Sequence, residues 1–221
     1  MIVNLIHQAL EANGFSKIHE NQKTGFYVRE KGAAIRFAVL HRLETLMPPG
    51  GLNEAINQSA PLAFTTDSAF KKNCDLICIH HLNTLAEFKD HEEQIFEIEE
   101  DPHFYKKYVL YYSDTEAEAI KNLDFEKLKE LLQNKAQFNL YKDDPAAATA
   151  YSVAAKIFIK LPFLQLPINK AELVPLRLQV EEAVAEKELT KTYNVIKKHS
   201  QIDVEDLMEE LISYELENFK N

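Results

Sequence analysis

The spacing of apolar residues along the sequence changes near Ser113, and this change constrains the fold more than any other feature. Before Ser113, short runs alternate apolar and polar residues or are continuously apolar, which is typical of β-strands. After it, "DTEAEAIKNL" and "DFEKLKELLQNKAQF" have helical spacing, and each opens with an Asp that can cap a helix. The pattern predicts an α+β fold, with a mixed β-sheet core in the N-terminal half and a mostly helical C-terminal part. We expect residues 1–114 and 115–221 to form two regions packed as one body.

The sheet is predicted to contain residues 74–80, 95–99 and 105–112. "KNCDLICIHHL" is an apolar run that suits a buried strand, and residues 95–99 alternate apolar and acidic side chains. Residues 105–112 are rich in aromatic side chains, which favour strands. The intervening "EDPHF" has the length of a hairpin turn, so the last two strands are expected to pair. A helix that begins at Pro102 is the alternative for 105–112. Two further helices are expected over 181–199 and 203–219.

Charge and hydropathy exclude several classes of protein. The chain has 221 residues and a net charge of −10, which argues against broad nucleic-acid binding by this chain alone, because a phosphate backbone is best met by a basic surface. A local basic patch stays open. The N-terminus reads as an amphipathic helix closed by Gly14 and lacks the basic start of a signal peptide. No apolar segment approaches the ~20 residues of a membrane span. We expect a soluble, cytoplasmic protein with no membrane contact.

The cysteine, histidine and glycine patterns predict no cofactor or metal. On a strand, Cys74 and Cys78 would face the same side roughly 13 Å apart, too far for a disulfide, so they are expected to be reduced core residues. His80 and His81 are adjacent and would point to opposite faces, so only one of them can join a given site. The loop "PPGG" at 48–51 is followed by no phosphate-binding motif.

One reading of the acidic residues is a metal-dependent, restriction-endonuclease-like nuclease. Such sites place an Asp after one strand and an acid-x-acid or acid-x-lysine pair on the next, where the carboxylates hold a metal that activates water. Asp75 followed by Glu97 and Glu99 has this order, and Lys106 or Lys107 would supply a positive charge. The motif is weak, since such acid pairs occur on many solvent-facing strands and Glu99 stands where a lysine is normally wanted.

The simpler reading is structural. If residues 95–99 and 105–109 form a hairpin, acids on one strand face Lys106 or Lys107 on the other, and each exposed pair contributes roughly 0.2–1 kcal/mol. A sheet face of this kind needs no metal. The sequence leaves both readings open.

A resemblance to a known family adds a third reading. The run "FEIEEDPHFYKKYVLYYSD", preceded by "NCDLICIHHL", resembles the core motif of the middle components of ABC-three-component systems, the group that includes Lamassu-type bacterial defence. That motif has an apolar strand, a Glu-rich segment ending in Glu-Asp-Pro, an aromatic residue, a pair of basic residues, and an apolar strand ending in tyrosines. The resemblance covers residues 75–114. The matching charged residues are Glu97, Glu99, Glu100, Asp101, Lys106 and Lys107.

The resemblance implies a non-catalytic accessory subunit of an anti-phage or anti-plasmid complex. Its partners would be an SMC-like ABC ATPase, which senses foreign DNA, and an effector, often a nuclease. The DNA contact would then belong to the ATPase, which suits the acidic charge of this chain. The charged segment, with Tyr108 and Tyr111 nearby, would be a docking surface or a structural motif, because aromatic and charged residues make good interface anchors.

Overall fold

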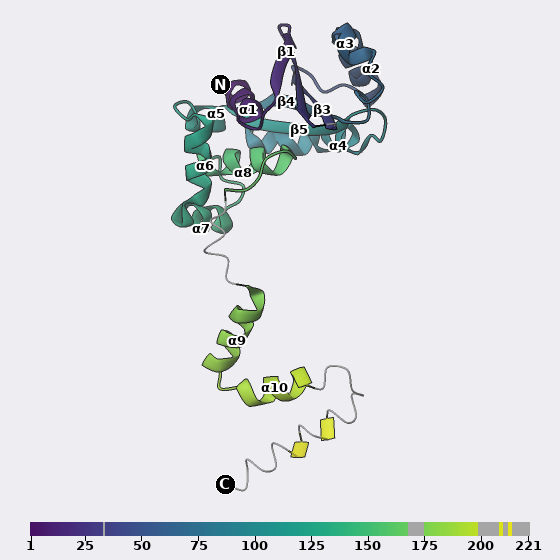
Figure 1. Ribbon diagram of the computed structural model, residues 1–221. Helices are drawn as coiled ribbons and strands as arrows, with labels where there is room; N and C mark the ends of the chain where they lie inside the picture. Colours follow the sequence, from purple (N-terminus) through teal and green to yellow (C-terminus); the bar gives the residue numbers. More distant parts are fainter. Residues whose placement is uncertain (33, 168–174, 199–207, 210–211, 214–221) are drawn as a thin grey trace. The chain divides into compact units, whose positions relative to one another are not determined.

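The computed structural model describes residues 1–32, 34–167, 175–198, 208–209 and 212–213 (Figure 1). The chain divides into two compact units, Met1–Pro167 and Ile168–Asn221. The first unit contains a five-stranded mixed sheet with helices before, between and after its strands. The predicted α+β class, with the sheet in the N-terminal half, is confirmed.

The sheet has the strand order β1-β2-β3-β4-β5. Its first three strands pair antiparallel, whereas β4 runs parallel to β3 and β5 runs parallel to β4. The strands predicted at 74–80 and 105–112 are confirmed as β4 and β5. The bounds are β1 Ser16–Glu20, β2 Thr24–Lys31, β3 Ala34–Leu43, β4 Cys74–Leu82 and β5 Lys106–Ser113.

Helices form the crossovers that the parallel strands require. Helices α2 (Pro49–Ser59) and α3 (Leu62–Thr65) lie between β3 and β4 in the chain, and a short 3-10 turn (Leu85–Glu87) with α4 (Phe88–Glu100) lies between β4 and β5. Before the sheet, α1 spans Ile2–Ala12 and is closed, as predicted, by Gly14. The φ of Gly14 is +79°, in the left-handed region that glycine adopts without steric strain. The N–H of Phe15 bonds back to the carbonyl of Leu10 at 3.0 Å, which closes this helix end.

The sheet is buried on both faces, and β4 shows how the sequence achieves this. Leu76 and Cys78 pack in a core with residues of α2, α3 and α4, whereas Ile77 and Ile79 pack in a second core with residues of α1, α6 and α8. Successive strand residues point to opposite faces, so a continuous apolar run fills both cores. Cys74 and Cys78 are free, buried and on the same face, as predicted.

The helices after the sheet begin at side-chain caps. Ser113, rather than the expected Asp114, accepts from the N–H of Glu116 and forms a capping box at the start of α5, while Asp124 caps α6 as predicted. The run expected as one helix from 124 to 138 is interrupted at Asn134, which caps α7. The bounds are α5 Asp114–Ala119, α6 Phe125–Gln133, α7 Lys135–Asp143 and α8 Ala150–Lys160.

The strand predicted at 95–99 is wrong, and so is the hairpin that depended on it. These residues form the last turns of α4, whose buried side chains are Ile95 and Ile98. Their spacing of three places both on one side of a helix, where they pack against the sheet. Glu97 and Glu99 therefore do not share one face, because two residues of a helix turn the side chain by about 200°. The partner of β5 is β4, in parallel register, and not residues 95–99.

The second unit contains α9 (Leu176–Glu186) and α10 (Thr190–Lys198). Glu181 of α9 accepts hydrogen bonds from Arg177 at 2.9 Å and from Lys197 of α10 at 3.3 Å. Helix α9 has no buried residue. The helix predicted at 203–219 lies almost wholly outside the described residues.

Candidate functional site

The charged and aromatic residues singled out from the sequence are divided among α4, the loop 101–105 and β5. Their surroundings differ sharply. Glu97, Glu100 and Lys106 are exposed; Glu99, Asp101, Tyr108 and Tyr111 are half-buried; and Lys107 is buried.

Lys107 holds the loop between α4 and β5. Its ammonium lies 2.7 Å from a carboxylate oxygen of Asp101, and its side chain is fully buried. It also donates to the backbone carbonyls of His103 at 2.6 Å and Tyr105 at 3.2 Å. A buried ammonium requires such partners, because an unpaired charge in the interior is strongly unfavourable. These contacts fix the path of the chain from the end of α4 into the first residues of β5.

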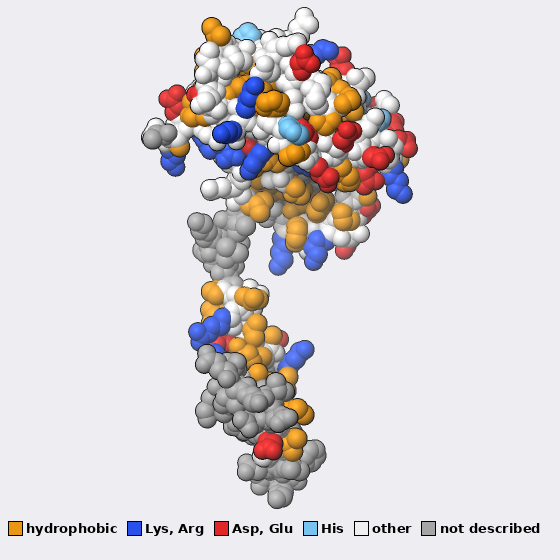
Figure 2. Space-filling model, turned by 90° about the vertical axis from the view of Figure 1, so that its right-hand side faces the viewer, with side chains coloured by type: hydrophobic (Ala, Val, Ile, Leu, Met, Phe, Trp, Pro, Cys, Tyr) orange, Lys and Arg blue, Asp and Glu red, His pale blue; other side chains and the backbone are white. Residues whose placement is uncertain are grey.

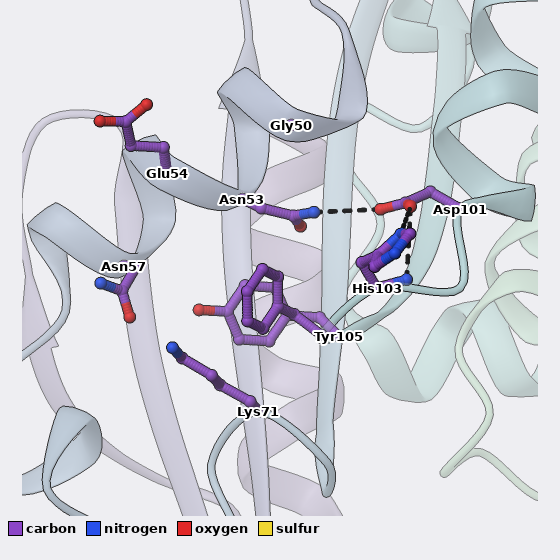
Figure 3. Close-up of a pocket in the computed structure, with 9 residues that line it drawn as sticks. Gly50, Asn53, Glu54, Asn57, Lys71, Asp101, His103 and Tyr105 are labelled. Atoms are coloured by element: carbon purple, nitrogen blue, oxygen red, sulfur yellow. Dashed lines mark hydrogen bonds and ion pairs between the residues drawn. The ribbon is translucent and has the colours of Figure 1, made fainter.

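Asp101 connects this loop to α2. Its Oδ2 accepts from the amide nitrogen of Asn53 at 3.0 Å, and its Oδ1 lies 2.8 Å from Nδ1 of His103 (Figure 3). Burial by itself would raise the pKa of Asp101, but the hydrogen bonds from Lys107, His103 and Asn53 outweigh it and hold the pKa far below its usual range. The carboxylate is therefore ionised at every physiological pH and fixes its three partners in place.

Glu99 and two lysines of α8 cover the free edge of β5. Because β5 is the last strand of the sheet, every second residue points its backbone polar groups away from β4. The N–H of Val109 donates to Glu99 at 2.7 Å, and Lys160 of α8 binds the same carboxylate at 2.5 Å. The carbonyl of Tyr111 accepts from Lys156 at 3.3 Å. This edge is occupied by charged side chains of the same chain and is not open to an added strand.

Asp75 is neutralised by an arginine. Its carboxylate is 2% exposed and accepts from Nε of Arg36 at 2.8 Å. Half of the residues that line the cavity beside it, of about 410 Å³, are cationic, among them Arg36, Lys72 and Lys106. Among the residues that the structure describes, no three His, Cys, Asp or Glu side chains lie close enough to hold a metal ion. The proposed nuclease set of Asp75, Glu97 and Glu99 thus does not converge.

A pocket of about 350 Å³ lies between α2 and the loop 101–105. Asn53, Glu54 and Asn57 of α2 line it, together with Lys71 and the loop residues Asp101 to Tyr105 apart from Pro102. Figure 3 shows the Tyr105 hydroxyl and the Lys71 ammonium pointing toward the side on which Asn57 lies. Oδ1 of Asn53 and the hydroxyl of Tyr105 are buried without a hydrogen-bond partner. Burial raises the pKa of the Tyr105 hydroxyl, so it keeps its proton.

Little in the sequence predicts this pocket. Asp101 belongs to the charged motif, but the stretches that contain Asn53 and Lys71 carry no binding motif. Their approach depends on the crossovers that place α2 beside the end of α4, which residue spacing does not reveal. The one local signal is "EDPHF", because an Asp-Pro pair marks a turn.

Residues 40–136 match the family model of the ABC-three component (ABC-3C) system Middle Component 1. The matched residues include β4, α4 and β5, the Asp101–Lys107 ion pair and the residues lining the pocket. The match agrees with the resemblance of residues 75–114 to the middle components of ABC-three-component systems. No curated protein and no solved structure matches the chain.

Proposed function

We propose that this chain is a non-catalytic accessory subunit of a bacterial ABC-three-component defence system of the Lamassu type. In this role it bridges an SMC-like ABC ATPase and an effector protein in the cytoplasm. The observation that carries the proposal is the middle-component match over residues 40–136, which covers the most distinctive part of the first unit. A component of a three-part system acts through contacts with the other parts.

The charge of the chain supports this division of labour. A net charge of −10 disfavours independent binding to a phosphate backbone, so DNA reaches the complex through the ATPase. The carboxylate that a nuclease would need, Asp75, is paired with Arg36 and is not available as a free ligand. No described helix is long and apolar enough to cross a bilayer.

Two surfaces suit the two partners. The first is the exposed part of the motif in the first unit, Glu97, Glu100 and Lys106. The second is α9, which exposes Leu176 by 75% and Leu178 by 48%. Figure 2 shows hydrophobic side chains at the surface of the described part of the second unit. A helix with exposed leucines and no buried residue has its apolar side chains available to a partner. In our proposal the charged surface binds the ATPase and α9 binds the effector.

The proposal is tested by recovering a tagged chain expressed from its native operon and identifying what comes with it. One variant reverses the charged surface with Glu97→Lys, Glu100→Lys and Lys106→Glu, and leaves the buried Lys107 unchanged. Its matched control reverses an exposed pair elsewhere, with Glu118→Lys and Lys121→Glu. We expect the first variant to lose the ATPase and the control to keep it.

The second arm tests α9. Leu176→Glu with Leu178→Glu is expected to lose the effector and keep the ATPase. Leu62→Glu is the control, because Leu62 is an equally exposed leucine, at 77%, in the first unit. Recovery of neither partner by the wild-type chain contradicts the proposal. So does cleavage of DNA by the purified chain with magnesium or manganese.

A further inference from the structure

The pocket between α2 and the loop 101–105 contains two buried polar atoms without a hydrogen-bond partner in the chain. In the described part of the chain, three buried side-chain polar atoms lack a hydrogen-bond partner, and two of them, Asn53 Oδ1 and the Tyr105 hydroxyl, belong to residues that line this pocket. Asn53 is 5% exposed and Tyr105 is 2% exposed. Native proteins pair the large majority of such atoms. Two unpaired atoms in one pocket require a partner from outside the chain, either ordered water or a bound group.

The fold fixes the hydrogen-bonding role of one of these two atoms, the side-chain oxygen of Asn53. The amide nitrogen of Asn53 donates to Asp101, and Asp101 is itself held by Lys107. A carboxylate accepts only, so the carbonyl oxygen of Asn53 faces the pocket as an acceptor. The Tyr105 hydroxyl, one loop residue before β5, can donate or accept. The buried wall therefore requires a ligand with an N–H donor beside an acceptor or a second donor.

The mouth of the pocket has an aromatic face and a cation. Phe104 has a φ of +63°, in the left-handed region that bulky residues rarely adopt, and its side chain is 52% exposed. The ammonium of Lys71 lies 4.6 Å from the centre of the Phe104 ring. Strained backbone of this kind is concentrated at sites where the strain positions a functional group. Here it presents a flat apolar ring next to a positive charge.

We propose that this pocket binds the base of a small nucleotide, whose phosphate pairs with Lys71. A nucleobase is planar and has adjacent donors and acceptors on its edge, which match Asn53 and Tyr105. Base stacking on an aromatic side chain is a common source of affinity. The cavity volume of about 350 Å³ lies in the range of small-ligand pockets. The same chemistry is offered by a free nucleotide and by an unpaired base of a single strand.

The test is calorimetry with the purified full-length chain. The probes are the four common ribonucleoside 5′-monophosphates, the matching nucleosides, inorganic phosphate, and a mixed-sequence single-stranded oligonucleotide. We expect at least one monophosphate to bind at micromolar concentration, and inorganic phosphate alone not to bind in this range. Tighter binding of the oligonucleotide assigns the base to a strand, and tighter binding of the monophosphate assigns it to a free nucleotide.

Three variants separate recognition from folding. Tyr105→Phe removes an unpaired hydroxyl, so the fold does not depend on it, and we expect affinity to fall about 5- to 10-fold. Tyr112→Phe, the same change on β5 away from the pocket, is expected to bind like the wild-type chain. Lys71→Ala is expected to weaken the monophosphate but not the nucleoside. The proposal is overturned if no base-bearing probe binds below about 1 mM, or if Tyr105→Phe and Tyr112→Phe bind equally well.

Discussion

Two adjacent lysines differ completely in their surroundings at the scale of single residues. Lys106 is exposed, whereas the side chain of Lys107 is fully buried against Asp101. The sequence identified both as members of one basic pair but did not tell them apart. Neighbouring residues of a strand point to opposite faces of the sheet. Which face is covered depends on where α4 packs, and this is set by the tertiary structure rather than by the local sequence.

This difference predicts unequal effects on stability. Lys107→Met leaves the carboxylate of Asp101 without its cation and should lower the free energy of unfolding by about 3 kcal/mol. Lys106→Met changes an exposed side chain and should alter it by less than about 0.5 kcal/mol. Urea denaturation at pH 7 measures both. Equal effects of the two substitutions would show that the ion pair contributes no more than a surface lysine does.

Two buried histidines predict a loss of stability in mild acid. Burial lowers the pKa of His41 and of His80, so the folded protein favours their neutral forms. Their contribution is complete above the unfolded pKa of about 6.5 and is lost as the pH falls below it, because the unfolded state then binds more protons. The urea midpoint should decrease between pH 7.5 and pH 5.5. His41→Asn should make this decrease smaller, and an unchanged slope would contradict the assignment to His41.

At the scale of elements, α4 shows where the sequence pattern was ambiguous. The alternation of apolar and acidic residues over 96–99 fits a strand, but the spacing of Ile95 and Ile98 fits a helix equally well. The length of the segment decides in favour of a helix, because α4 begins at Phe88 and buries residues at helical spacing against the sheet. By contrast, β4 and β5 were predicted correctly, because long apolar or aromatic runs bounded by turn residues have few alternatives.

The covered edge of β5 makes a prediction about α4. Glu99→Ala removes the acceptor of the Val109 N–H and the partner of Lys160, so it should lower the free energy of unfolding by about 1–3 kcal/mol. Glu97→Ala, two residues earlier on the exposed side of the helix, should change it by less than about 0.5 kcal/mol. Hydrogen exchange gives a local check, because the Val109 amide should exchange faster in Glu99→Ala alone. Unchanged protection of that amide would mean that another group takes the place of Glu99.

At the scale of the whole molecule, the pocket illustrates what spacing cannot predict. Asn53 lies on α2 and Tyr105 lies just before β5, and the two are brought together only by the crossovers of the parallel strands. No motif of nearby residues marks such a site. The charged motif was recognisable because its residues lie close together in the sequence, whereas the two sides of the pocket are separated in the chain by α3, β4 and α4.

The division into two units leads to the last prediction. The first unit, Met1–Pro167, contains both hydrophobic cores and every described strand, and no described core residue belongs to the second unit. A chain ending at Pro167 should therefore unfold in one cooperative transition, with a midpoint close to that of the corresponding transition in the full chain. Thermal unfolding followed by circular dichroism measures both.

The same truncated chain should retain nucleotide binding, since the pocket lies within residues 50–105, and should lose the partner that α9 is proposed to bind. A truncated chain that is folded and recovers both partners would place the effector contact in the first unit and contradict the role of α9. A truncated chain that fails to fold would show that the second unit contributes to the stability of the first.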